Sequence, residues 1–179
     1  MKVIYRLADD VSAIAAMQRA SLGHEAIGLR QTHGLICSPK WWLNVQRGAL
    51  ETHTVRGVIR GIWFGQYHCG PAEFQMELAD GTLFGGHCYL DPEDADRAFT
   101  LGRIAEVDYV LQLSKSSELR DESPTSVWLE VRLGDTVNCQ VTPLPHTEKN
   151  FGRFSKLSNV GGTPAHPHKS KNSWWAFWR

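Results

Sequence analysis

Two histidine–cysteine pairs are the residues of this 179-residue chain whose types could hold a metal ion. His68-Cys69 and His87-Cys88 flank an Asp80-Gly81 dipeptide, which is a strong β-hairpin turn signal. A two-residue turn would pair Phe74 with His87 and bring both pairs to one end of the hairpin. However, neighbours in a strand point to opposite faces, and no CxxC or HxxxH spacing is present. We therefore predict packed or surface side chains here, with no metal and no cofactor.

The acidic run from Asp91 to Asp96 is a second candidate, because paired carboxylates can act as acid and base. Its pattern is better explained as a helix start, in which Asp91 caps, Pro92 takes the first position and acids fill the first turn. The chain has no Gly-x-Ser-x-Gly elbow, no Gly-rich phosphate loop and no HExxH motif. We predict a protein that is not an enzyme. A metal-dependent enzyme built on the two His-Cys pairs is the most remote alternative.

The charges are unevenly distributed along the chain, although 19 basic and 19 acidic residues cancel. Residues 1–51 carry a net charge of +2, residues 52–141 carry −7, and residues 142–179 carry +5. The near-neutral composition therefore conceals a dipolar molecule, which affects its choice of partner.

The basic segment 142–179 ends in a cluster of large aromatic residues behind a stretch rich in Pro, Gly, Lys and His. Exposed aromatic side chains usually mark a docking site. We predict a flexible tail whose tip binds a groove on a larger protein through Trp174, Trp175, Phe177, Trp178 and Arg179. Docking onto the chain's own body ranks second, and a membrane interface third.

Helix signals dominate the first 51 residues. Asp9 or Asp10 can cap one or two helices within residues 10–31. A second helix should begin with Ser38 as its cap and Pro39 in its first turn, and should end near Gly48. Its tryptophan pair, at 41 and 42, is typical of a helix packed onto a sheet.

Strand patterns begin at Thr52. We expect strands at residues 54–67 (bent at Gly61), 73–78, 82–90, 103–113 and 127–133, and a short sixth at 136–141. Three meandering strands, a short helix and two more strands match the oligonucleotide/oligosaccharide-binding (OB) barrel, with an SH3-like barrel as the runner-up. The predicted fold is α+β: N-terminal helices (1–51) packed on a small five- to six-stranded antiparallel OB-like β-barrel (52–141), with a flexible C-terminal tail (142–179).

Such a barrel makes single-stranded nucleic acid the alternative partner. The stacking face would carry Trp63, Phe64, Tyr67 and Phe74, with Arg56 and Arg60 opposite phosphates. The net charge of −7 opposes this, because affinity for nucleic acid comes largely from cationic side chains.

Trp128 is a further partner-binding candidate. Alternation that turns Val127, Leu129 and Val131 inward would point Trp128 outward with Glu130 and Arg132.

The compartment is predicted from the N-terminus and the cysteines. Residues 1–22 contain no continuous apolar run, which argues against a signal peptide or a membrane span. Four scattered cysteines give no disulfide framework. We expect a cytoplasmic protein with free thiols. The combined prediction is a non-enzymatic adaptor or regulatory protein that binds a protein partner.

Overall fold

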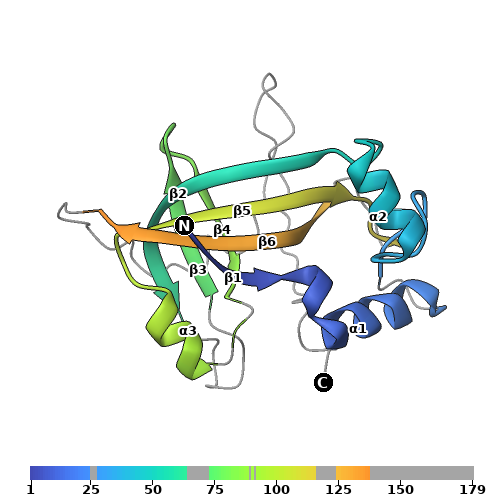
Figure 1. Cartoon of the computed structure of the whole chain (residues 1–179), viewed down its shortest axis with the longest axis horizontal. Coiled ribbons are helices and arrows are strands. Elements are labelled where there is room, and N and C mark those ends of the chain that lie inside the picture. The colour runs from blue at the N-terminus through green and yellow to red at the C-terminus, as the bar shows by residue number, and fades with distance from the viewer. Residues whose placement is uncertain (25–27, 64–72, 89, 91, 116–123, 138–179) are drawn as a thin grey trace, which may run out of the picture.

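The computed structural model describes residues 1–24, 28–63, 73–88, 90, 92–115 and 124–137 (Figure 1). In chain order the elements are β1 (Lys2–Arg6), a 3₁₀ turn η1 (Leu7–Asp9), α1 (Val11–Leu22), α2 (Pro39–Gln46), β2 (Thr52–Trp63), β3 (Glu73–Leu78), β4 (Leu83–His87), α3 (Pro92–Ala98), β5 (Arg103–Gln112) and β6 (Thr125–Thr136). Residues 142–179 lie outside the described part of the chain, so the predictions for the tail and its aromatic tip are not tested.

The strands form one six-stranded antiparallel sheet in the order β1-β6-β5-β2-β3-β4. The α+β class is confirmed, but the closed OB-like barrel is wrong. Among the described residues β1 and β4 lie at the two ends of the strand order and do not pair with each other. Strand β1 lies in a segment predicted to be helical, whereas most of the short strand predicted at 136–141 lies outside the described part of the chain. The Val3-Ile4-Tyr5 run of β1 has the β-branched and aromatic residues that strands favour.

The sheet curls so that its β4 end faces β5 and β6. The ring of Phe84 in β4 stacks on Trp128 in β6 at 5.7 Å and lies 5.5 Å from Tyr109 in β5. Phe74 in β3 lies 5.8 Å from Trp128 and 4.7 Å from Phe99, which follows α3. Most of the hydrophobic core therefore lies on the inner face of a strongly curved, open sheet.

A β-bulge in β6 changes which side chains point inward. Asp108 of β5 pairs with Glu130, but the next residue, Tyr109, pairs with Trp128, so Leu129 is an extra residue in β6. A bulge moves the following side chains to the opposite face. The predicted outward orientation of Trp128 is therefore wrong: Trp128 is 6 % exposed and lies on the inner face beside Tyr109.

Two predictions about the strands, a bend near Gly61 and a turn at Asp80-Gly81, agree with the structure at least in part. A register shift between Ile59 and Gly61 confirms a bend in the first long strand, near Gly61. The Asp80-Gly81 turn is confirmed, but its loop has three residues, because Leu78 pairs with Thr82 through a 2.8 Å backbone hydrogen bond. Gly81 adopts a φ of +81°, which suits glycine in such a loop.

The helices begin where the sequence predicts. The Asp10 carboxylate accepts a hydrogen bond from Ala13 N at 2.9 Å, and the Ser38 hydroxyl accepts one from Trp41 N at 3.3 Å. Trp41 is fully buried and donates through Nε1 to Gln112 Oε1 of β5 at 2.9 Å, so α2 does pack on the sheet.

Gly85 provides a test of the curled β3–β4 hairpin. A Cβ atom at this position would collide with the backbone carbonyl oxygen of Phe74, which cannot move without disturbing the ladder. Gly85→Ala should therefore lower the free energy of unfolding by about 1 to 3 kcal/mol. The control is Gly134→Ala, whose Cβ would lie 3.4 Å or more from its neighbours. Equal melting temperatures for the two variants would contradict the observed hairpin register.

Candidate partner-binding site

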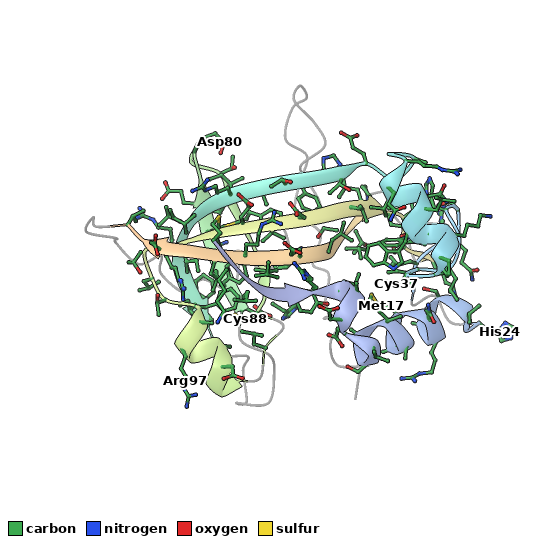
Figure 2. The ribbon with its side chains drawn as sticks, in the orientation of Figure 1. Met17, His24, Cys37, Asp80, Cys88 and Arg97 are labelled. Atoms are coloured by element: carbon green, nitrogen blue, oxygen red, sulfur yellow. The ribbon has the colours of Figure 1, made fainter. Side chains whose placement is uncertain are left out.

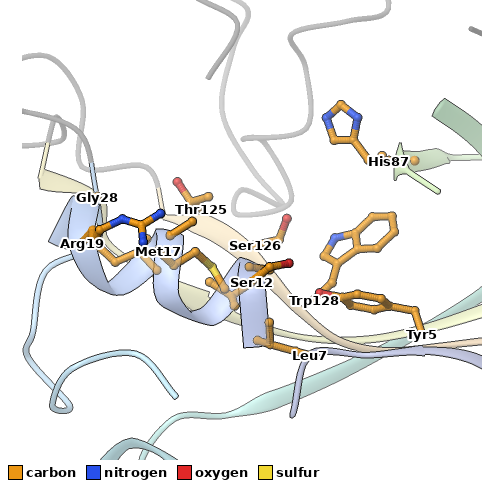
Figure 3. A pocket seen from close by; sticks show the side chains of 16 residues that line it. Tyr5, Leu7, Ser12, Met17, Arg19, Gly28, His87, Thr125, Ser126 and Trp128 are labelled. Carbon is orange, nitrogen blue, oxygen red and sulfur yellow. The ribbon is translucent and has the colours of Figure 1, made fainter. Parts of the chain in front are cut away.

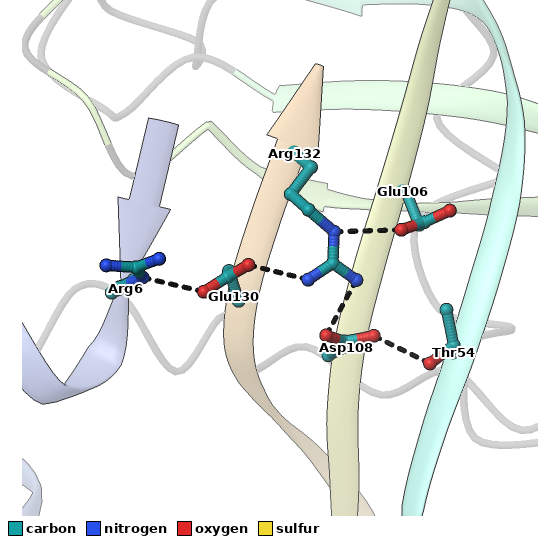
Figure 4. A network of polar contacts seen from close by, with 6 residues as sticks. All are labelled: Arg6, Thr54, Glu106, Asp108, Glu130 and Arg132. Carbon is teal, nitrogen blue, oxygen red and sulfur yellow. Dashed lines mark hydrogen bonds and ion pairs between the residues drawn. The ribbon is translucent and has the colours of Figure 1, made fainter. Parts of the chain in front are cut away.

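The outer face of the sheet carries a network of charged side chains from three neighbouring strands (Figure 4). Arg132 in β6 donates to Glu106 at 2.8 Å, to Asp108 at 2.7 Å and to Glu130 at 2.6 Å. Arg6 of β1 donates to the second oxygen of Glu130 at 2.7 Å. One guanidinium group thus holds three carboxylates in fixed positions.

The network continues onto β2. Thr54 donates its hydroxyl to Asp108 at 2.6 Å, and Arg56 stands opposite Glu106 in the strand register. We call the surface formed by Arg6, Thr54, Arg56, Glu106, Asp108, Glu130 and Arg132 the polar face. Thr54 and Arg56 are exposed, so the polar face is accessible to a partner along β2.

The side chains at the centre of the polar face are partly shielded. Arg132 and its three carboxylates are only 20 to 22 % exposed, whereas Arg6 is 53 % exposed. Burial acts to raise the pKa of Glu130, but hydrogen bonds from Arg6 and Arg132 hold that pKa below its ordinary value of 4.5. The carboxylate is therefore ionised at neutral pH, and the network is preorganised.

A second feature is a cavity of about 600 Å³ on the other side of the sheet, between α1 and β4 (Figure 3). We call it the α1–β4 cavity. Tyr5 and Trp128 line one end of it, Met17 lies in the middle and Arg19 lies at the opposite end. His87 also contributes to the wall. The cavity is thus bordered by both ends of the strand order, β1 and β4, at the place where the sheet does not close.

Helix α1 is attached to the rest of the chain by polar contacts in its C-terminal half and by Ile14 and Met17, which pack against the core. Within the helix only Ser21 is buried, and its hydroxyl accepts a hydrogen bond from Leu29 N at 3.1 Å. Lys115 donates to the carbonyl oxygens of Ala20 and Gly23 at 3.0 and 2.6 Å, which satisfies the C-terminal end. Ala16 and its neighbour Met17 line the cavity.

Beside the cavity, Glu73 of β3 pairs with His87 of β4, and His87 Nδ1 lies 3.5 Å from Glu73 Oε1. Burial raises the pKa of Glu73 to about 7 and lowers the pKa of His87 to about 4. At neutral pH His87 is therefore uncharged. A two-residue turn would pair His87 with Phe74, but the three-residue loop shifts the register by one residue and places Glu73 opposite His87.

Several predicted site residues have a different environment from the one expected. Phe74 is 1 % exposed and belongs to the core, so the prediction that it stacks on bases is wrong. Arg60 forms an ion pair with Glu77 at 2.8 Å and is less exposed than predicted, whereas Arg56 does point to solvent. Trp63 lies over Gly61, and Trp128 lines the α1–β4 cavity. Phe64, Tyr67, His68, Cys69 and the tail residues lie outside the described part of the chain.

The two cysteines that the structure describes are free thiols located apart along the long axis of the molecule (Figure 2). Cys88 is buried in the core, and burial raises the pKa of Cys37 to about 12, so neither has the character of a nucleophile. The described residues contain no group of three or more side chains suited to hold a metal ion. None of the described helices has the length and apolar character needed to cross a membrane.

The polar face was not predicted, although the sequence contains a signal for it. Glu106 and Asp108 alternate with buried residues in β5, and Glu130 and Arg132 do so in β6. Opposite charges on one face of adjacent antiparallel strands form cross-strand pairs. Pairing these two strands in sequence would have identified the network.

Removing the central cation tests the network. Arg132→Met should lower the free energy of unfolding at pH 7 by about 1 to 3 kcal/mol, because three carboxylates lose their shared partner. Since the folded-state pKa of Glu130 lies below 4.5, its stabilisation is present above pH 4.5 and disappears as the pH falls through the folded-state value. The difference from wild type should therefore shrink in acid. Arg97→Met is the control, because Arg97 is 78 % exposed and lies 3.9 Å from Asp94.

The Glu73–His87 pair gives a pH-dependent prediction. Because the pKa of Glu73 rises from 4.5 to about 7 on folding, its contribution to stability falls as the pH rises through that range. The pKa of His87 falls from 6.5 to about 4 on folding, so the contribution of His87 to stability rises with pH between those two values. Glu73→Gln removes only the first effect, so its melting temperature relative to wild type should be higher at pH 8 than at pH 5. Glu77→Gln, in the same strand, is the matched control for loss of a carboxylate, because Glu77 lies in an ion pair with Arg60.

Comparison with known proteins adds one finding. Residues 1–134 match the protein family described as "Immunity protein RhsI2". No curated protein matches the chain. The match begins before β1 and ends within β6, so it includes every strand of the sheet, the polar face and the α1–β4 cavity. The chain therefore belongs to the RhsI2 immunity protein family.

Proposed function

We propose that this protein neutralises a toxin protein by binding it directly, as a non-enzymatic immunity protein. The observation that carries the proposal is the extent of the family match, which covers residues 1–134 and thus the described sheet except for the last two residues of β6. Family membership supports a protein-binding regulatory role, the coarser form of the function expected from the sequence.

We assign the contact with the toxin to the polar face. Arg132 and Arg6 already hold the carboxylates of the polar face in the unbound protein. Less side-chain conformational entropy is therefore lost when the toxin binds. Arg56 projects into solvent from β2 next to this network, and arginine is enriched among the residues that dominate interface energies. A rigid charged surface of this kind favours specificity and orientation of the partner.

The charge of the folded unit indicates the chemistry of the partner. Residues 1–137 carry thirteen basic and eighteen acidic side chains, a net charge of −5. This charge attracts a basic protein surface and repels a phosphate backbone. Burial of Phe74 and pairing of Arg60 with Glu77 further weaken the case for nucleic acid. We therefore propose a toxin that carries a net positive charge.

Inhibition by binding, and not by chemical modification of the toxin, fits the state of the candidate reactive groups. Glu106, Asp108 and Glu130 are tied to arginine, and the Cys37 thiol is protonated at neutral pH. These side chains support a structural and recognition role.

The C-terminal tail, residues 142–179, is not assigned to toxin binding. The sequence predicts its aromatic tip to be a docking motif, but residues 135–179 lie beyond the family match. We assign recognition of the toxin to residues 1–134 and a different contact to the tip.

Binding to the cognate toxin tests the proposed function. The purified full chain should elute with the toxin as a one-to-one complex in size-exclusion chromatography. The association rate should fall as salt rises, because a basic toxin is steered by the acidic unit. Failure to form a complex would contradict the proposed function.

A matched pair of arginine variants tests the assignment of the surface. Arg56→Glu should weaken the complex by about 2 kcal/mol or more if Arg56 is an interface hot spot. Arg97→Glu, the same change on exposed α3, should have little effect. A complex that forms normally with both variants would refute the polar face as the contact surface and leave toxin binding itself intact.

A further inference from the structure

We propose that the α1–β4 cavity is the docking site for the aromatic tip of the chain's own C-terminal tail, residues Trp174 to Trp178. This contact is distinct from recognition of the toxin, which we assign to the polar face on the other side of the sheet.

The cavity has the character that an aromatic side chain requires. Its volume of about 600 Å³ falls in the range of roughly 300 to 1,000 Å³ typical of sites that enclose small ligands. The rings of Tyr5 and Trp128 form one end, and Met17, whose sulfur makes favourable contacts with aromatic rings, lies in the middle. A second aromatic side chain can therefore stack or pack edge-on inside it.

The charges of the two parts are complementary. Residues 1–137 carry a net charge of −5, and residues 138–179 carry six basic side chains and one acidic, a net charge of +5. Lys169 and Lys171 stand directly before the aromatic tip. Long-range attraction therefore draws the tail toward residues 1–137 as a whole. The described part of the cavity wall carries Arg19 and no acidic side chain, so burial of the aromatic rings, and not charge, holds the tip in the cavity.

The length of the tail permits the contact without strain. Trp174 follows Val137 by 37 residues. A flexible chain of that length has a root-mean-square span of roughly 33 Å, whereas a unit of this size has a radius of gyration of about 14 Å. The tip can reach any point on the surface, and its effective concentration is on the order of 1 mM. Modest affinity is then enough for the cavity to be occupied within the same chain.

Photo-crosslinking of the full chain tests the proposal. Replacing Phe177 with p-benzoylphenylalanine and irradiating should produce crosslinks within one chain, mapped by mass spectrometry to Met17 or to the Ser126–Trp128 segment of β6. Their yield should not depend on protein concentration. Crosslinks between two copies, or crosslinks only to residues outside the cavity, would overturn the proposal.

Two alanines in α1 provide the matched control. Ala16 lines the cavity and Ala15 does not, so Ala16→Phe should fill the space and abolish the crosslink, whereas Ala15→Phe should retain it. If the crosslink survives Ala16→Phe in a protein that melts normally, the tip does not occupy this cavity.

Hydrogen exchange gives a readout that requires no substitution in the cavity. With an effective concentration on the order of 1 mM and a dissociation constant of about 0.1 mM, the cavity is occupied about ten times as often as it is empty. Amides of residues 12–19 should then exchange about tenfold faster in the Trp175→Ala/Trp178→Ala double variant than in the wild-type chain. Identical exchange rates in this segment would refute docking of the tip against α1.

Discussion

The register between β5 and β6 is the constraint on which the rest of this structure depends. Leu129 is an extra residue in β6, and it places Trp128 on the inner face while Glu130 and Arg132 remain on the outer face. Without the bulge, strict alternation would put Trp128 on the same face as the two charged residues. One inserted residue therefore separates an aromatic core from a polar surface. The bulge places Trp128 beside the α1–β4 cavity, and the pairing of β5 with β6 next to the bulge forms the polar face, so both candidate sites depend on this register.

On the inner face, the bulge is accompanied by a sheet that curls without closing. Trp128 stacks on Phe84, and its ring fits against Gly86 so closely that a Cβ there would lie 2.6 Å from it. The tryptophan ring thus packs between β6 and β4 on the inner face of the sheet. The α1–β4 cavity lies beside this ring, and helix α1 forms one of its walls. The outer consequence is the polar face, where Arg132 organises three carboxylates that would otherwise repel one another.

Local signals in the sequence predicted the local structure well. Ser38 and Pro39 fix the start of α2, Asp10 caps α1, and Asp80-Gly81 turns the β3–β4 hairpin, because each depends on residues a few positions apart. Features that depend on contacts between distant parts of the chain were harder to predict from the sequence. The bulge at Leu129 and the pairing of β1 with β6 depend on partners far apart in the chain, and a single-residue change of register moves a side chain to the other face. The site was missed for the same reason, since Glu106 and Asp108 meet Arg132 only after β5 and β6 are aligned. The protein-binding role was inferred from the tail, whereas the family match lies in the folded unit.

The central claim is that this chain inhibits a toxin by forming a stoichiometric complex with it. A titration of toxin activity tests that claim most directly. Increasing amounts of the full chain are added to a fixed amount of active toxin, at concentrations well above the dissociation constant. The account predicts a linear loss of activity that reaches zero at one equivalent, with full activity recovered once the complex is dissociated. Complete and irreversible inactivation at a small fraction of one equivalent would show turnover, and would contradict inhibition by binding.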